Sequence, residues 1–336
     1  MALLKAGLSP DENAVVGRAL TELRQRTLID TYTLGNAIMA IEALYAPESE
    51  FGRLRDGTID RPLPRQPSAE DKALLQRWVD RLMSNADTSV DPNRLLRFHY
   101  VGNHDFDNSC NQYGLLGLYS AHLCGIEIPP VAWEAAAYHW LDTQVDAGEK
   151  VTLELVDYRT HARRLLDPDA SVTAARSVMR GNGWGYKGAR DGGEHAEVWG
   201  SMTCAGITGL AICQAALQDH PDYSQRKLQA DCDRARRDGF AWLAEHLTVR
   251  HHPGAILRQR RWFYYYLYSL ERAALLSGVA LIQDRDWYFE GAMVLALSQL
   301  DDGNWPGELT ADQAIERNAM AILFLKQSTR PVLTGR

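Results

Sequence analysis

The sequence lacks the short motifs that identify several large enzyme classes. It contains no Gly-x-Ser-x-Gly turn, no glycine-rich phosphate loop ending in Gly-Lys-Ser/Thr and no His-Glu-x-x-His motif. Its five cysteines form no Cys-x-x-Cys pair, and four of them lie in apolar segments. The cysteine pattern favours free thiols in a reducing, cytoplasmic compartment.

Long runs of like charge are also absent. The chain has 36 Lys and Arg against 43 Asp and Glu, a formal net charge of −7, so a nucleic-acid partner is not expected. Its first ten residues are too short for the apolar region of a secretory signal. They resemble the last turns of a helix closed by Gly7, which leaves open that the chain lacks an N-terminal part of a longer parent.

Two kinds of helical segment alternate along the chain. Amphipathic segments with one charged face recur at 12–26, 69–84, 131–144, 229–247 and 286–299. Segments that are apolar almost all round lie between them, at 31–45, 108–126, 201–218, 263–278 and 316–327. Such helices must be covered on every side, and their frequent polar interruptions argue against a transmembrane segment. The alternation predicts an all-α fold, an α/α toroid with concentric inner and outer rings of helices.

Residues 1–336 are expected to form this one toroid domain. Two long connections, 46–68 and 145–199, show few helical periods apart from a short helix expected near 170–180, and β-structure is expected to be sparse. Connections of this length in a compact domain are usually functional or disordered. Small residues of the apolar segments, such as Gly114, Gly117, Gly206 and Gly209, allow close helix packing or leave a central hollow.

A repeat motif carries a family resemblance. Gln299, Gly303 and Trp305 follow the last amphipathic segment with the spacing Gln-x3-Gly-x-Trp, and Gln144 with Gly148 forms a degenerate copy. With the openings of the apolar segments, these residues make the chain resemble the terpenoid cyclase and protein prenyltransferase superfamily, in particular bacterial squalene cyclase or prenyltransferase repeat proteins. In this motif the Gln caps backbone groups where an outer helix stops, and the Trp packs over that end.

The resemblance implies a central cavity for an apolar, isoprenoid-type substrate. Class II cyclases of the superfamily carry an Asp-x-Asp-Asp acid motif, and here Asp105, Asp107 and Asn108 give Asp-x-Asp-Asn. Asp107 would then be the general acid that protonates an alkene or epoxide. The residues also fit a helix N-cap, since Asp, Asn and Ser are favoured there, and a cap carboxylate is stabilised as the anion. Both interpretations stay open.

Candidate cavity residues come from the openings of the apolar segments, from the start of the last amphipathic segment and from the aromatic residues at the glycine-rich stretch 181–193. They are Cys110, Tyr113, Trp184, Tyr186, Trp199, Cys204, Tyr264, Tyr265, Trp287 and Asn318. Aromatic faces suit an apolar ligand and stabilise a carbocation. Trp184, Tyr186 and Trp199 fit a second interpretation, in which they anchor a long connection.

Two further hypotheses remain. In the prenyltransferases of the superfamily an Asp, a Cys and a His hold zinc, so Asp107, Cys110, Cys204 and His195 would be the ligands here. The spacing of Asp107 and Cys110 is one residue too long for that pattern, and lone cysteines on apolar helices are usually core residues, so no cofactor is expected. The other hypothesis is a noncatalytic toroid that binds or scaffolds. The oligomeric state is not predicted.

Overall fold

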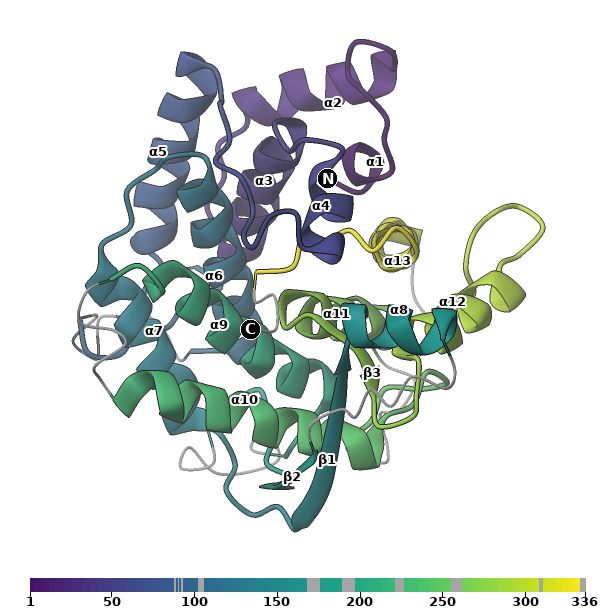
Figure 1. Ribbon diagram of the computed structural model, residues 1–336. Coiled ribbons are helices and arrows are strands. Elements are labelled where there is room, and N and C mark those ends of the chain that lie inside the picture. Colours follow the sequence, from purple (N-terminus) through teal and green to yellow (C-terminus); the bar gives the residue numbers. More distant parts are fainter. Residues whose placement is uncertain are drawn as a thin grey trace.

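The computed structural model describes residues 1–87, 89, 91, 93–101, 106–167, 176–188, 197–220, 227–254, 262–307 and 311–332, and for 311–313 only the backbone. This described part contains thirteen helices and one three-stranded sheet (Figure 1). The protein is therefore mostly helical, as the alternation of segments predicts.

The apolar segments form five helices that follow one another through the molecule. These are α3 (Thr31–Leu44), α6 (Asn108–Leu123), α9 (Gly200–Leu217), α11 (Phe263–Leu276) and α13 (Ala311–Leu325). α3 packs on α6, α6 on α9, α9 on α11 and α11 on α13, while the short helix α1 (Ala2–Lys5) contacts both α13 and α3. Each of these helices therefore has a neighbour on two sides, and the neighbours cover apolar faces that water would otherwise meet.

The amphipathic segments form a second set, α2 (Ala14–Gln25), α5 (Ala69–Met83), α7 (Pro130–Thr143), α10 (Lys227–His246) and α12 (Trp287–Ser298). α5 packs on α3 and α6, α7 and α10 pack on α9, and α12 packs on α13. α12 differs from the expected charged outer face: Phe289, Met293 and Leu297 are 60%, 46% and 81% exposed. They lie opposite the buried Trp287 and Leu295, because a helix separates its faces with a period of 3.6 residues.

The two long connections contain more structure than the sequence predicts. The first holds α4 (Glu50–Asp56), and the second holds β1 (Lys150–Asp157), α8 (Tyr158–Leu166) and β2 (Arg176–Arg180). β1 pairs antiparallel with β2 on one side and with β3 (Val279–Ile282) on the other. The helix expected near 170–180 is wrong at 176–180, where β2 lies. Buried Val151 and Leu153 join β1 to the main core, and Val156 forms a separate small cluster with Leu281 of β3. Helical periodicity does not reveal these strand contacts.

Close packing explains the apolar character of α9. Among the described helices it alone is long and apolar enough to cross a membrane, yet 94% of that segment is buried inside the fold. Two glycines on α9 let large rings approach its backbone: a Cβ at Gly206 would overlap the ring of Trp184, and one at Gly209 would overlap the ring of Trp140. The close-packing interpretation of these small residues is confirmed.

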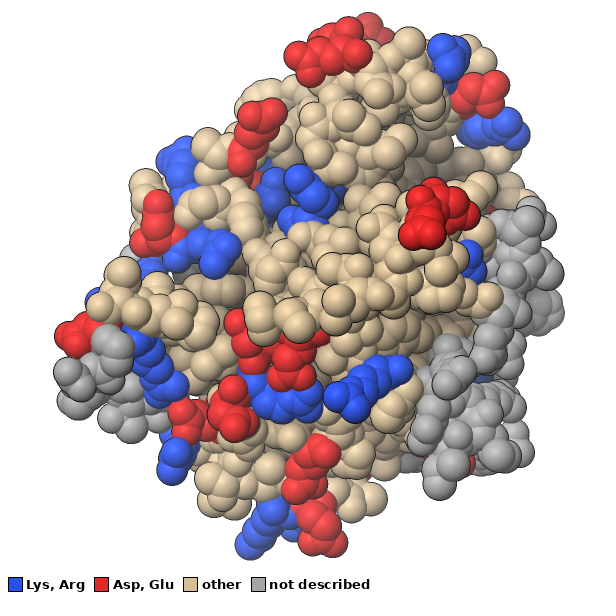
Figure 2. All heavy atoms as spheres, turned by 90° about the vertical axis from the view of Figure 1, so that its right-hand side faces the viewer, with Lys and Arg blue, Asp and Glu red and all other residues tan. Residues whose placement is uncertain are grey.

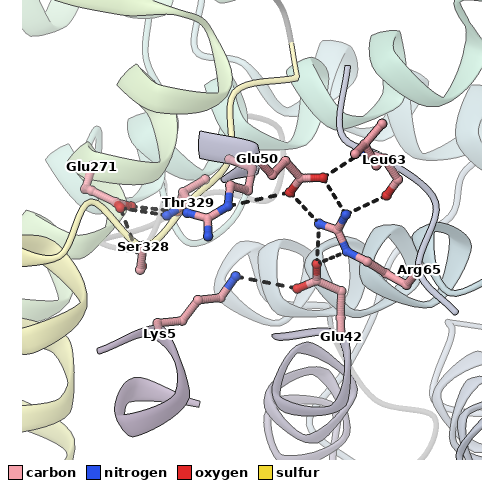
Figure 3. Close-up of polar contacts among 9 residues, drawn as sticks. Lys5, Glu42, Glu50, Leu63, Arg65, Glu271, Ser328 and Thr329 are labelled. Atoms are coloured by element: carbon pink, nitrogen blue, oxygen red, sulfur yellow. Dashed lines mark hydrogen bonds and ion pairs between the residues drawn. The ribbon is translucent and has the colours of Figure 1, made fainter. Parts of the chain in front are cut away.

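A buried ionic network joins the N-terminal and C-terminal segments (Figure 3). Arg65 Nε donates to Glu42 Oε1 at 2.7 Å, and Arg65 Nη2 donates to Glu50 Oε2 at 2.8 Å. Lys5 Nζ lies 3.5 Å from Glu42, and Arg330 Nε lies 3.6 Å from Glu50. The Arg65 and Glu50 side chains are fully buried, so the network is shielded from water and salt.

Candidate functional site

A cavity of about 1010 Å³ lies among the N-terminal halves of α3, α6 and α11 and one side of α13. Its volume is at the upper end of the range of about 300–1,000 Å³ that is usual for small-molecule sites. Eight aromatic side chains line it: Tyr32, Tyr100, Tyr113, Tyr186, Trp199, Trp262, Tyr265 and Tyr268. The cavity therefore presents aromatic and aliphatic surface to a ligand.

Four of these tyrosines form a continuous stack. The ring centroid of Tyr32 lies 5.5 Å from that of Tyr100 and 4.4 Å from that of Tyr113, and the Tyr113 centroid lies 6.4 Å from that of Tyr265. Burial raises the pKa of Tyr32 and of Tyr265 well above the ordinary value, so both hydroxyls stay protonated. The stack offers electron-rich ring faces without offering a phenolate.

Two helix N-caps place carboxylates on the cavity wall. Asp30 Oδ1 accepts a hydrogen bond from Thr33 N at 2.8 Å at the start of α3. Asp107 Oδ1 accepts one from Ser109 N at 2.7 Å at the start of α6, and a second from the Ser109 hydroxyl. The N-cap interpretation of Asp107 is confirmed. Asp107 also lines the cavity, a position that is compatible with a role as an acid. That role stays a prediction.

The other two residues of the acid motif do not join Asp107 in the described structure. Asp105 lies outside the described residues. Asn108 is buried, and its side chain donates to Gly185 O at 2.9 Å and contacts His139 Nε2 at 2.8 Å through Oδ1. Burial lowers the pKa of His139 to about 3, so this ring is neutral. Asn108 therefore fixes the start of α6 against α7 and does not line the cavity.

The predicted aromatic residues divide into two groups. Tyr113, Tyr186, Trp199 and Tyr265 line the cavity, whereas Trp184, Tyr264 and Trp287 do not. The indoles of Trp184 and Trp287 are fully buried and donate to backbone oxygens, those of Trp140 at 2.8 Å and Val279 at 3.0 Å. The Tyr264 hydroxyl donates to Pro306 O at 2.7 Å. One step along a helix turns a side chain by about 100°, which is why neighbours Tyr264 and Tyr265 face different surroundings.

Comparison with protein-family models, curated proteins and solved structures finds no match. The resemblance to the cyclase superfamily therefore stays a prediction that depends on the residues themselves.

The Gln-x3-Gly-x-Trp motif makes one of its two expected contacts. Trp305 Nε1 donates to Leu295 O at 2.8 Å, so this ring packs over the end of α12 as predicted. Gln299 Nε2 donates to Gly303 O at 2.9 Å in the loop and not to the helix end. Asn318, expected in the cavity, belongs to this brace: its Oδ1 accepts from Trp305 N at 3.2 Å.

The described residues do not form a zinc site. Cys110 and Cys204 are fully buried, and burial raises the pKa of both thiols, which disfavours the thiolate that zinc binds. Within the described ranges no three His, Cys, Asp or Glu side chains come together as a metal site would require. His195 lies outside those ranges.

Several cavity residues were missed from sequence. Asp30 and Tyr32 open the first apolar segment just as Asp107 opens the second, so comparing segment openings would have found them. Tyr268 lies about one helical turn beyond Tyr265 in the same apolar segment, so the helical period would have found it. On the face that carries α12, acidic and basic side chains are interspersed over the described surface (Figure 2).

Proposed function

We propose that the chain is a toroid of the terpenoid cyclase type that binds an apolar, isoprenoid-type small molecule in its aromatic cavity. The toroid is supported by the ordered contacts from α3 to α13, with α1 between α13 and α3. The binding proposal rests on one observation, the cavity of about 1010 Å³ lined by eight aromatic side chains. The five described cysteines are free and buried, which supports a cytoplasmic location.

The chemistry of the lining suits a branched hydrocarbon chain with one polar end. Beside the aromatic rings, the charged side chains of the lining are Asp30, Asp107, Lys187 and Glu316. Burying a methyl-branched chain against ring faces gains about 25 cal/mol for each Å² of apolar surface removed from water. A ligand of the C20 to C30 class supplies enough such surface to bind without any metal or cofactor.

Two adjacent tyrosines of α11 give the test. Binding of geranylgeraniol is measured by titration calorimetry to wild type, Tyr265→Ala and Tyr264→Ala. Tyr265 lines the cavity and Tyr264 does not, so we expect about a tenfold or greater loss of affinity for the first variant only. Equal affinities in all three proteins, or no binding to wild type, would contradict the proposal.

A second candidate function is protonation-initiated cyclisation with Asp107 as the general acid. The observation that favours it is that Asp107 lies on the same cavity wall as the tyrosine stack. In this scheme the carboxyl proton adds to an alkene carbon, the cation is held by ring faces, and loss of a proton from the cyclised cation restores the acid. The net reaction is an isomerisation.

Asn is as good an N-cap as Asp, so Asp107→Asn removes the acid and keeps the cap. Squalene and geranylgeranyl diphosphate are incubated with wild type, Asp107→Asn and the matched cap variant Asp30→Asn, and products are identified by mass spectrometry. We expect product from wild type and Asp30→Asn and none from Asp107→Asn. Unchanged substrates with wild type would contradict cyclisation and leave the binding function alone.

A further inference from the structure

The inner helix α11 carries an arginine with no carboxylate bound to it. Arg272 is 1% exposed, and its guanidinium carbon lies 4.0 Å from the ring centroid of Tyr268 and 5.3 Å from that of Tyr113. Nη2 donates to Gln112 Oε1 and to Ser269 Oγ, each at 3.1 Å. Both acceptors are neutral side chains, and no described carboxylate forms an ion pair with Arg272, although the adjacent buried Glu271 interacts with it electrostatically.

Two donor nitrogens of Arg272 are also unused. Nε and Nη1 are buried and have no hydrogen-bond partner among the described residues. A guanidinium keeps its proton inside a protein, so burial cannot neutralise it. Leaving a charged donor buried and unsatisfied is more costly than leaving a neutral donor so. These nitrogens therefore point to an acceptor that is not part of the chain.

A small cavity of about 70 Å³ lies beside this guanidinium. Four cationic side chains line it, Lys5, Arg65, Arg272 and Arg330, and Glu42 is the carboxylate of the lining. Arg330 Nε, which lies 3.6 Å from its ion-pair partner, is likewise without a hydrogen bond. The volume equals that of about two water molecules, at about 30 Å³ each, or of one carboxylate group.

The small cavity adjoins the large one. Met1 and Tyr268 line both, so the ring of Tyr268 stands between the aromatic cavity and Arg272. A chain lying in the aromatic cavity would thus have its end closest to a buried cation. An anionic end of such a ligand is complementary in charge to the cationic side chains that line the small cavity.

We propose that the small cavity is an anion site that binds a carboxylate through Arg272, with Arg330 as a second donor. The carboxylate has two possible sources. One is a free small carboxylate, and the other is the acid end of an isoprenoid chain that occupies the aromatic cavity. The second source rests on the proposed function, whereas the first does not.

Bromide tests the site without any assumption about the large cavity. Crystals of the protein are soaked in sodium bromide, and the anomalous signal is mapped. We expect a bromide peak in the small cavity next to Arg272, which sodium acetate displaces at equal ionic strength. Water alone in the cavity under both conditions would overturn the proposal, whatever the aromatic cavity binds.

A matched pair of C20 ligands tests the second source. Geranylgeranoic acid and geranylgeraniol differ in their polar end, and we expect the acid to bind wild type about tenfold or more tightly than the alcohol. Arg272→Met should abolish this preference, so that acid and alcohol bind the variant equally, while Arg272→Lys should keep part of it. Arg55, which also lies over two aromatic rings but outside both cavities, gives the control Arg55→Met.

The outcomes separate the two proposals. Equal affinities of acid and alcohol for wild type exclude the chain-borne carboxylate and leave cavity binding intact. Binding of neither ligand contradicts the proposed function, and the bromide peak then decides the anion site alone. The wild-type comparisons hold even if Arg272→Met does not fold.

Discussion

Gly35 of α3 packs directly on the backbone of Tyr113 in α6. A Cβ at Gly35 would overlap the Tyr113 carbonyl oxygen and lie 3.1 Å from its carbonyl carbon. From the other side, a Cβ at Gly117 would lie 3.0 Å from the Gly35 Cα. This close approach of two helices brings the rings of Tyr32 and Tyr113 together at the cavity wall.

Gly35→Ala should therefore destabilise the fold. The obstructing atoms belong to a backbone, which cannot rotate away, so we expect a loss of about 1–3 kcal/mol in the free energy of unfolding. Gly52 is a matched control, because it is also helical and a Cβ there meets nothing within 4 Å. Gly52→Ala should be neutral or stabilise by about 0.5–1 kcal/mol. Urea denaturation measures both, and wild-type stability of Gly35→Ala would exclude the close approach.

His139 should make the protein less stable in acid. Its Nε2 lies 2.8 Å from Asn108 Oδ1 and 2.7 Å from Asn111 Nδ2. Burial, with a smaller effect of Arg97, lowers its pKa from 6.5 to about 3. The stability that this group contributes is complete above the unfolded value near 6.5 and is lost as pH falls toward 3, at about 1.4 kcal/mol for each pH unit.

His139→Gln removes this proton uptake. Denaturation at pH 7, 6, 5 and 4 should show that the variant gains stability relative to wild type as the pH falls, even though the variant is less stable at pH 7. NMR of the wild-type ring should show no titration between pH 7 and pH 4. A ring that titrates near its ordinary pKa would mean that the buried Asn108–Asn111–His139 contact is wrong.

The sequence predicts segments better than it predicts which side chains meet. Periodicity located the five apolar and five amphipathic helices, because burial on every side leaves no room for charge. It could not separate Tyr265 from Tyr264, since both lie in an apolar run and only the rotation of α11 against its neighbours decides which faces the cavity. It missed the three strands because their pairing joins residues that are distant in the sequence: Glu154 of β1 pairs with Arg176 of β2, and Leu155 of β1 pairs with Ile282 of β3.

Site residues were predictable where they repeat a local rule and not where they depend on packing. Asp107 was found because an N-cap has a sequence signature. Asn108 was assigned to the same site, but its side chain turns toward His139, which no spacing reveals. Arg272 was missed because its proposed role follows from two buried donor nitrogens that have no described hydrogen-bond partner. Such a lack of partners is visible only in three dimensions.

Glu271 should act on stability in the opposite direction to His139. It is fully buried and accepts from Thr329 N at 2.9 Å and from Thr329 Oγ1 at 2.7 Å. Burial raises its pKa from 4.5 to about 7. The folded state therefore favours the protonated acid, and its contribution is complete below pH 4.5 and lost as pH rises toward 7, by about 1.4 kcal/mol for each pH unit.

Between pH 4.5 and pH 6.5 the slopes of Glu271 and His139 cancel. Glu271→Gln keeps a neutral acceptor for Thr329, so we expect it to be more stable than wild type at pH 8 and close to wild type at pH 4. Its stability should also fall more steeply than that of wild type on acidification from pH 6.5 to pH 4.5. Parallel stability curves for Glu271→Gln and wild type would contradict the burial of this carboxyl.

Arg65 should be the most costly single substitution in the ionic network of Figure 3. Burial acts to raise the pKa of Glu42, but Lys5 and Arg65 bring it below the ordinary value. Arg65→Met leaves Glu42 and Glu50 buried without their main partner, and removal of one member of a buried ion pair typically costs about 3–5 kcal/mol. Because the carboxylates and not the missing arginine cause the loss, adding Glu42→Gln and Glu50→Gln should recover much of it.

Arg61→Met, which breaks an exposed pair with Asp219, should change the free energy of unfolding by no more than about 1 kcal/mol. If the triple variant is no more stable than Arg65→Met, then Arg65 acts through packing and not through charge.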